Sequence, residues 1–363
     1  MRSGSHSREF WRDRKVFVTG HTGFKGSWLC LWLHRLGARV QGYSLPPPTE
    51  PSLFERARVG EIIESTLGDI RESRRLADVM REFAPDIVLH LAARSVVLDA
   101  YDDPIETYST NVVGTASVLD AVRRLTGKCA VVNVTTDKVY ENRGWVWGYR
   151  EDDTLGGRDP YSNSKACAEL VAHAFTESWF RDPGPSGRLV GLASARAGNV
   201  IGGGDWTPHQ LIPDAIAAFS RGQPVVLRNP TATRPWQHVL DCLGGYLTLA
   251  EALYREPAVF AGGWNFGPAD ADMQPVSSVV EQIAAPWGVQ PAWVQDTATW
   301  PHEAMELRLN SQKAHRKLAW SGRLSLATAL AWTSTWFRGH LAGDDARGLC
   351  ESQIDAYLNL EAP

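Results

Sequence analysis

Hydrophobic residues in the first 200 positions gather in short runs rich in Val and Ile, and longer amphipathic stretches separate these runs. The runs are continuous instead of alternating, which is typical of strands covered on both faces of a parallel sheet. Strands that alternate with helices in this way predict a doubly wound α/β fold. The predicted strands are 15–20, 39–45, 61–66, 86–93, 129–136 and 189–196, and the predicted helices lie near 25–36, 71–83, 103–125 and 160–181.

The pattern changes after about residue 200, where loops rich in Gly and Pro, such as "IGGGDWTP" and "LRNPTATRPW", separate shorter elements. We predict a smaller α+β region here, which packs across the edge of the sheet. Its predicted helices lie near 209–221, 237–255, 274–287 and 325–341, with short strands at "PVVLR" and "WNFG".

The composition argues against several classes of function. A net charge of −4 disfavours binding to nucleic acid or to an anionic membrane surface. The five cysteines are scattered and form no CxxC pair, so we expect a reducing compartment and no metal. "HEAME", from His302 to Glu306, has Glu where a zinc-binding helix needs its second His. Without an apolar leader or a run of eighteen apolar residues, a cytoplasmic protein is expected.

A glycine-rich loop, "TGHTGFKG", joins the first predicted strand to its helix. Gly20 permits a tight turn, Gly23 lets the backbone approach a pyrophosphate, and Gly26 lets the helix pack closely on the strand. The helix amino terminus then faces the phosphates with free N–H groups. We therefore predict a Rossmann-type cofactor-binding domain over 10–200 and a substrate-binding region over 201–363, with some chain crossing between the two. Thr22, Phe24 and Lys25 belong to the same predicted cofactor loop.

The remaining cofactor contacts are predicted at the ends of the next strands. Ser44 ends the second strand, where NAD-specific folds often carry an acid, and no Arg there signals a 2′-phosphate. NAD is favoured, although not by this position, and Lys25 would be the nearest residue to read a 2′-phosphate. Asp69 could bond the adenine amino group or cap the helix at 71–83. Ile70, Leu91, Ala92 and Ala93 complete the predicted set.

A catalytic pair is predicted in "DPYSNSKACAE", where Tyr161 and Lys165 stand four residues apart on one helix face. A nearby ammonium lowers the pKa of a phenol, which would make Tyr161 a usable general base for an alcohol or sugar hydroxyl.

With these motifs the chain resembles the extended short-chain dehydrogenase/reductases. "TGHTGFKG", "LHLAARS", "YSTNVVGT" and "YSNSKACAE" occur in that family's order, and the resemblance covers nearly the whole chain. It implies that Thr136 hydrogen-bonds a sugar hydroxyl and that Asn111 holds helix geometry and a water. It also implies a homodimer built from the helices near 103–125 and 160–181, although a face buried against the sheet would give the same apolar pattern.

The pair Asp137-Lys138 after the fifth strand separates the subgroups of this family. Epimerases usually have no acid–base pair there, whereas sugar 4,6-dehydratases add groups that remove water. Together with "GYSLPPPTEPSLFE", "WGYREDDTLGGRDPYS" and "PHEAMELRLNSQKAHRKLAW", the pair is similar to the CDP-glucose 4,6-dehydratases. This resemblance implies CDP-glucose as substrate, oxidation at C4 by NAD with Tyr161 as base, loss of water across C5 and C6, and return of the hydride to C6.

Elimination needs an acid at the 6-hydroxyl and a base at C5, which we assign to Asp137 and Lys138. Lys138 could instead stabilise the enolate, and Glu141 could take part. The alternative for the pair is a solvated strand end without a role in catalysis.

Substrate contacts are predicted at Ser95, Asn199, Arg234 and His302. The family resemblance implies that Asn199 binds the diphosphate region. The guanidinium of Arg234 suits the same group, although a tether between loop and helix would also explain it. His302 could close over the nucleotide or sit on a helix cap, and Arg196 could contact substrate or form a structural ion pair.

Two other functions are compatible with the sequence. One is a different nucleotide-sugar 4,6-dehydratase or a 4-epimerase, and the other is an NAD-binding scaffold or sensor without turnover. The Asp137-Lys138 pair argues against epimerisation, and the presence of Thr136, Tyr161 and Lys165 argues against a scaffold.

Overall fold

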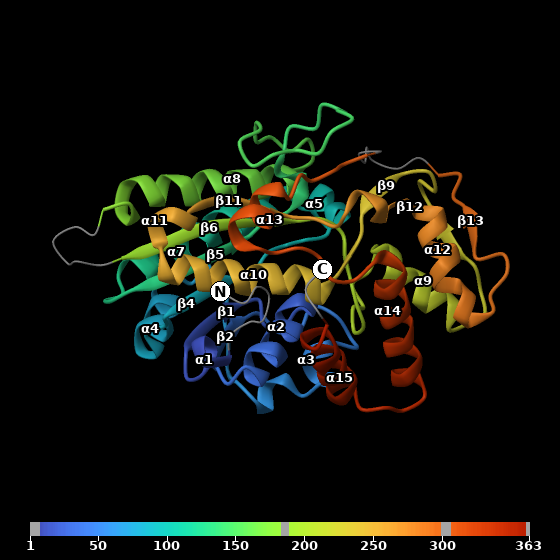
Figure 1. The fold of residues 1–363 in the computed structure, drawn as a ribbon, viewed down its shortest axis with the longest axis horizontal. Helices are drawn as coiled ribbons and strands as arrows, with labels where there is room; N and C mark the ends of the chain where they lie inside the picture. The colour runs from blue at the N-terminus through green and yellow to red at the C-terminus, as the bar shows by residue number, and fades with distance from the viewer. Residues whose placement is uncertain (1–7, 183–188, 299–305, 361–363) are drawn as a thin grey trace.

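A computed structural model describes residues 8–182, 189–298 and 306–360 (Figure 1). Its centre is a seven-stranded sheet in which every neighbouring pair is parallel, in the order β11-β6-β5-β4-β1-β2-β3. The predicted doubly wound α/β class is confirmed. The strands are β1 (Lys15–Thr19), β2 (Arg39–Ser44), β3 (Glu64–Leu67), β4 (Ile87–His90), β5 (Cys129–Val134), β6 (Val190–Ala197) and β11 (Gly262–Phe266).

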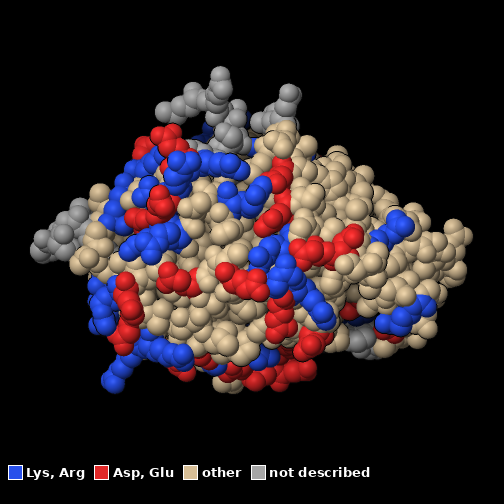
Figure 2. Space-filling view, turned by 90° about the horizontal axis from the view of Figure 1, so that it is seen from below, with Lys and Arg blue, Asp and Glu red and all other residues tan. Residues whose placement is uncertain are grey.

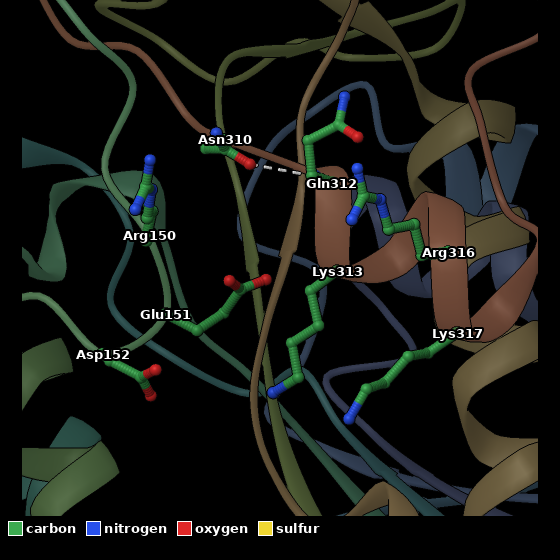
Figure 3. Close-up of a pocket in the computed structure, with 8 residues that line it drawn as sticks. All are labelled: Arg150, Glu151, Asp152, Asn310, Gln312, Lys313, Arg316 and Lys317. Carbon is green, nitrogen blue, oxygen red and sulfur yellow. Dashed lines mark hydrogen bonds between the residues drawn. The ribbon is translucent and has the colours of Figure 1, made fainter.

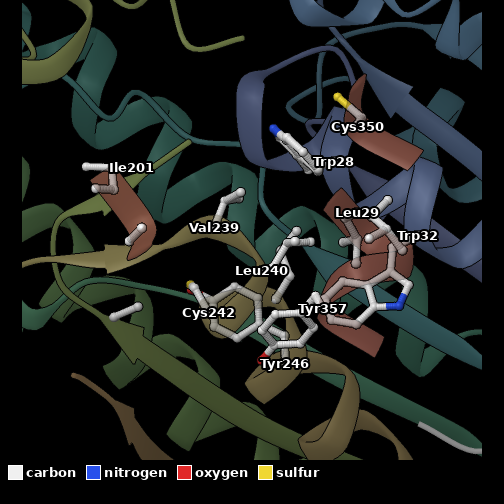
Figure 4. Packing of buried hydrophobic residues seen from close by; sticks show 14 of the residues in the cluster. Trp28, Leu29, Trp32, Ile201, Val239, Leu240, Cys242, Tyr246, Cys350 and Tyr357 are labelled. Carbon is white, nitrogen blue, oxygen red and sulfur yellow. The ribbon is translucent and has the colours of Figure 1, made fainter. Parts of the chain in front are cut away.

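Helices cover both faces of this sheet, as the continuous apolar strands require. On one face α2 (Phe24–Arg35), α10 (Val239–Arg255), α14 (Leu326–Leu341) and α15 (Ala346–Leu358) enclose the larger hydrophobic cluster. Figure 4 shows Trp32 of α2 beside Tyr357 of α15, with Leu240 and Tyr246 of α10 close to Tyr357. On the other face α4 (Ser73–Phe83), α7 (Gly114–Arg123) and α8 (Pro160–Phe175) pack over a second cluster.

The long predicted helix over 103–125 is built from consecutive pieces. α6 (Pro104–Tyr108) runs into a π-helical turn, η2 (Ser109–Val113), and then into α7. A second π-helical turn, η4 (Thr176–Phe180), extends α8. Such turns insert one extra residue per turn, so they rotate the residues that follow around the helix axis.

Two predictions about the sheet are wrong. β3 begins at Glu64 instead of 61 and is mostly exposed, because it is the edge strand and has only β2 as a neighbour. "WNFG" was assigned to the smaller region, yet its residues form β11, which pairs with β6 and completes the sheet. Neither the edge position of β3 nor the return of β11 is encoded in local hydrophobicity, because both depend on which strands pair.

The second half of the chain forms the smaller region, to the right in Figure 1, and also crosses back to the sheet through α10 and β11. The smaller region has three two-stranded sheets, β10-β7, β12-β9 and β13-β8. The remaining strands are β7 (Val200–Ile201), β8 (Val225–Leu227), β9 (Thr233–Pro235), β10 (Gln237–His238), β12 (Met273–Pro275) and β13 (Trp293–Gln295). The remaining helices are α1 (Arg8–Trp11), α3 (Leu53–Arg56), α5 (Val97–Asp102), α9 (Leu211–Phe219), α11 (Pro257–Phe260), α12 (Val276–Ala284) and α13 (Gln312–Leu318).

The surface seen in Figure 2 carries Lys and Arg interspersed with Asp and Glu and shows no continuous basic patch. Within the described ranges, no helix has the length and apolarity needed to cross a membrane. The same part of the chain contains no group of three His, Cys, Asp or Glu side chains placed to hold a metal ion.

Candidate active site

The glycine turn joins β1 to α2 in the geometry that its sequence predicts. Gly20 has φ +76°, and a Cβ there would lie 2.7 Å from the Ala92 nitrogen. A Cβ on Gly26 would lie 2.1 Å from the Gly20 carbonyl oxygen, so helix and turn pack too closely for any side chain. α2 then begins at Phe24 with Gly23 as its N-cap and no side-chain cap. The uncapped amino terminus of this helix fits a dinucleotide pyrophosphate.

The residues predicted to line the cofactor lie around this turn. The Thr22 hydroxyl is 2.8 Å from the Ser44 hydroxyl and donates to the Leu45 carbonyl at 2.9 Å, which joins the glycine turn to the end of β2. The backbone nitrogens of Leu91 and Ala92 both donate to the Thr19 hydroxyl at 3.2 Å. Lys25 and Ala93 are half-buried beside the same turn and strand end, respectively.

Asp69 and Ile70, after β3, have other partners. Asp69 binds the Arg71 guanidinium, and this hydrogen bond lowers the pKa of the carboxyl. α4 begins only at Ser73 with Glu72 at the N-cap, so the alternative that Asp69 caps this helix is wrong. The adenine contact of Asp69 stays a prediction. Ile70 is buried in the second hydrophobic cluster, where a Cβ on Gly114 would lie 2.4 Å from its Cδ1.

α8 places Tyr161 and Lys165 under the carboxyl end of β5. Asp159 caps the helix by accepting from the Ser162 nitrogen at 2.9 Å, and Pro160 occupies the first turn. Tyr161 and Lys165 are 8% and 5% exposed. The Lys165 ammonium donates to the Val134 carbonyl at 2.9 Å, and the Tyr161 phenol interacts with the Thr136 hydroxyl.

Lys165 is predicted to lower the pKa of the Tyr161 phenol, but other groups of the chain dominate this pKa. Burial raises the pKa of the Tyr161 phenol, the Asp137 charge raises it further, and only the Thr136 hydroxyl opposes them. Burial, with the nearby positive charge of Lys25, lowers the pKa of Lys165 to about 7. In the chain by itself burial penalises the charged form of both groups, and the Lys165 ammonium is held by a backbone carbonyl, so the effect of Lys165 on Tyr161 stays a prediction.

Asp137 is buried, and one oxygen of its carboxyl has no hydrogen-bond partner among the described residues. It begins a short 3₁₀ turn, η3 (Asp137–Val139), and its Oδ1 accepts from the Thr136 hydroxyl at 3.0 Å. Its Oδ2 has no hydrogen-bond partner among the described residues. Burial raises the pKa of this carboxyl, against the opposing charges of Lys138 and Arg234. At 2% exposure, Asp137 is not part of a solvated strand end, so that alternative is wrong for the acid of the pair.

The two candidates for the base differ in burial. Lys138 is half-buried next to Asp137. Glu141 is exposed and its carboxylate accepts from the Arg143 guanidinium at 2.8 Å. The structure therefore brings Lys138, and not Glu141, into the buried part of the site.

Three of the predicted substrate residues, Ser95, Asn199 and Arg234, are described and differ in exposure. Asn199 follows β6, and its Oδ1 is buried without a partner among the described residues. Arg234 lies in β9, is 5% exposed, and its positive charge acts on Asp137. Ser95 is exposed in the loop after β4. His302 lies outside the described residues.

Arg196 holds the site together without facing it. Its guanidinium binds the Glu169 carboxylate of α8, with Nε 2.9 Å from Oε1, and donates to the Tyr140 phenol at 2.7 Å. Tyr140 in turn donates to Asn265 Oδ1 at 2.6 Å. This resolves the alternatives for Arg196 in favour of a structural ion pair. The sequence reasoning missed Glu169 as its partner, and the only available signal was a Glu one turn after Lys165.

A separate cavity of about 580 Å³ lies between the loop at Arg150 and helix α13 (Figure 3). None of the predicted site residues lines it. Both signs of charge meet there, since Glu151 and Asp152 face the ammonium groups of Lys313 and Lys317. Lys313 is committed to the fold, because its ammonium donates to the Gly263 carbonyl at 2.6 Å.

The doubly wound sheet, the glycine turn before α2 and the Tyr161–Lys165 pair on α8 define an extended short-chain dehydrogenase/reductase. Residues 17–333 match the family model described as GDP-mannose 4,6 dehydratase. The chain belongs to this family, which confirms the family resemblance drawn from the motifs.

Individual relatives support the same assignment. The chain is 49% identical over 352 residues to a CDP-glucose 4,6-dehydratase of Salmonella typhimurium, covering 97% of this chain and 98% of that protein. It is 31% identical over 259 residues to a dTDP-glucose 4,6-dehydratase of Streptomyces griseus, covering 70% and 72%. The structure of MoeE5 in complex with UDP-glucose and NAD superposes with a TM-score of 0.73 at 26% identity, covering 90% of this chain and 99% of that one.

Burial of Lys165 predicts a measurable pH dependence of stability. Its pKa falls to about 7 in the folded chain, whereas an unfolded lysine titrates near its ordinary value of 10.5. Between these values the unfolded state binds more protons, so the free energy of unfolding should rise with pH, by up to about 1.4 kcal/mol per pH unit. Lys165→Met removes this contribution. Urea unfolding between pH 7 and 9 should therefore show that the free energy of unfolding rises with pH more steeply in the wild type than in Lys165→Met.

The control for this comparison is Lys317→Met, which replaces an exposed lysine on α13. If the difference in the free energy of unfolding between wild type and Lys165→Met stays constant from pH 7 to 9, Lys165 does not have a lowered pKa in the folded chain.

Proposed function

We propose that this protein is an NAD-dependent CDP-glucose 4,6-dehydratase, which converts CDP-glucose to CDP-4-dehydro-6-deoxyglucose. The observation that carries the proposal is the buried carboxyl of Asp137, whose pKa is raised and whose Oδ2 is free of hydrogen bonds within the described residues. An epimerase needs no proton donor at this position, whereas elimination of water does. The cytidine and the glucose rest on the relative that is 49% identical.

The glycine turn and the uncapped start of α2 would hold the pyrophosphate of NAD, with Thr22, Lys25 and Ser44 around it. Bound there, NAD supplies an acceptor and a later donor of hydride. Tyr161, next to the Thr136 hydroxyl, is assigned to take the proton of the 4-hydroxyl as C4 is oxidised. It must do so as the phenolate, and the positive charge of bound NAD would oppose the rise in its pKa that burial causes.

The 4-ketone acidifies the hydrogen at C5, and this makes elimination possible. We assign Lys138 to remove that proton and Asp137 to protonate the departing 6-hydroxyl. Asp137 suits the acid role because burial favours its protonated form. Lys138 suits the base role by position, since it is half-buried next to the acid while Glu141 is exposed and paired with Arg143.

Substrate binding is assigned to Arg234 and Asn199 near the diphosphate, with Ser95 and His302 as further contacts. The support for Arg234 is its burial beside Asp137, which places a permanent positive charge at the sheet edge. The cytoplasmic location inferred from the sequence remains a prediction.

The decisive assay incubates the purified protein with CDP-glucose and NAD and records the product mass and the alkaline absorbance of a 4-keto sugar. A dehydratase releases one water per sugar without net accumulation of NADH, because the same hydride leaves C4 and arrives at C6. A product of unchanged mass would identify an epimerase instead. A protein that binds NAD and changes none of the nucleotide sugars tested would point to a scaffold.

The assigned roles of Asp137 and Lys138 can be separated by isotope exchange in deuterated water. Asp137→Asn should still exchange the C5 hydrogen but lose water about 100-fold more slowly, the usual size of a general acid contribution. Lys138→Met should lose both exchange and elimination. Both variants should still oxidise C4, seen as NADH in a single turnover.

Glu141→Gln is the matched control, and it should leave both exchange and elimination nearly unchanged. Exchange that survives in Lys138→Met but disappears in Glu141→Gln would move the base to Glu141.

We also propose that two copies associate through α6, η2 and α8. Large apolar side chains are exposed along these elements and along η4, which extends α8: Ile105 is 78%, Val113 56%, Leu170 56% and Trp179 52% exposed. Isolated exposed apolar residues are common, but four of them along adjacent helices are typical of an interface.

Sedimentation of the wild type should give twice the mass of the chain, and Leu170→Asp should give a monomer. Val226→Asp tests the specificity, because Val226 is equally exposed, at 57%, but lies on β8 in the smaller region. A monomeric wild type, or dissociation by Val226→Asp alone, would contradict this interface.

A further inference from the structure

Four buried side-chain oxygens near the carboxyl ends of β5 and β6 have no hydrogen-bond partner among the described residues. One is Asn133 Oδ1, within β5, and the three beyond the strand ends are Asp137 Oδ2, Asn199 Oδ1 and Gln237 Oε1. Buried polar atoms are almost always hydrogen-bonded, so unpaired ones that occur together need an explanation. Gln237 differs from the other two because neither its sequence context nor the comparisons assign it any role.

The three residues lie on adjoining segments. A Cβ on Gly198 would lie 3.2 Å from Asp137 Oδ2 and 2.4 Å from Pro235 Cγ, so the chain before Asn199 runs between these two residues. The Gln237 nitrogen donates to the Asn199 carbonyl at 3.0 Å, and β10 pairs with β7. The segments that carry the three residues are therefore neighbours at this end of the sheet.

The amide of Gln237 cannot satisfy its oxygen by turning over. Its Nε2 donates to the Phe266 carbonyl at the end of β11, at 2.8 Å. A flipped amide would place two oxygens against each other and lose this hydrogen bond. The Oε1 atom is thus held as an acceptor in a residue that is 4% exposed, and it needs a donor.

A single unpaired amide oxygen does not identify a site. Gln353 on α15 makes the same contact, with Nε2 donating to the Trp332 carbonyl at 2.9 Å, and its Oε1 is also unpaired. What distinguishes Gln237 is its proximity to Asn199, and through Gly198 to Asp137, at the sheet edge where open α/β folds bind their ligands.

We propose that Gln237 is a sugar-binding residue whose Oε1 accepts a hydrogen bond from a hydroxyl of the hexose in the nucleotide sugar. This inference rests on the proposed function. An amide oxygen cannot bond to the phosphate oxygens, which are acceptors themselves, whereas a sugar hydroxyl is a donor. Arg234 supplies the positive charge that the diphosphate needs, so the neutral Gln237 is left for the hexose.

The test measures KM for CDP-glucose and the inhibition constant for CDP, which lacks the hexose, on the NAD-loaded enzyme. Gln237→Met should raise KM about five- to tenfold, the worth of one neutral hydrogen bond, and leave the inhibition constant of CDP unchanged. Gln353→Met removes the same kind of amide contact far from the site and should change neither constant. The melting temperature of each variant shows how much stability is lost with the hydrogen bond from Nε2 to the Phe266 or Trp332 carbonyl.

The unfolding data separate binding from tethering. A Gln237→Met protein that is destabilised no more than Gln353→Met but has a raised KM has lost a substrate contact and not only a structural one. An unchanged KM in Gln237→Met, or an equal loss of affinity for CDP, would overturn the inference while the proposed function stands. A wild-type enzyme that does not convert CDP-glucose would remove the proposed function, and the inference would fall with it.

Discussion

The buried ion pair between Arg196 and Glu169 is the interaction on which the active site depends. Both side chains are about 5% exposed or less, so removal of either partner would leave an uncompensated charge in the interior. Arg196 comes from β6 and Glu169 from α8, and Glu169 also accepts from the Thr135 hydroxyl after β5. Because Glu169 follows Lys165 by one helical turn, this pair sets the depth and rotation of the helix that carries Tyr161 and Lys165.

Burial then decides the protonation of the reacting groups. It raises the pKa of Asp137 and lowers that of Lys165, so each of the two groups is shifted toward its neutral form. The raised pKa of Asp137 favours its protonated form, which the proposed elimination of water requires. Sites that catalyse acid–base reactions commonly contain two groups whose pKa values are shifted in opposite directions by the same environment.

The C-terminal half of the chain completes the cofactor-binding half instead of forming a separate body. β11 adds the last strand to the sheet, and α10 covers β5 and β6. Asp241 on α10 accepts from the backbone of Arg323 and Leu324 and from the Tyr357 phenol, and burial raises the pKa of its carboxyl to about 6. One buried carboxylate thereby anchors the segment before α14 and the last helix to the core.

The sequence by itself determined the features that depend on neighbouring residues. The alternation of strands and helices, the glycine turn at Gly20 and Gly26, and the pairing of Tyr161 with Lys165 on one helix face all follow from local spacing. Only the tertiary structure decided that β11 returns to the sheet, that Asp137 is buried, and that Gln237 lies beside Asn199. These depend on contacts between residues far apart in the chain, and desolvation is a property of the folded surroundings that no single segment encodes.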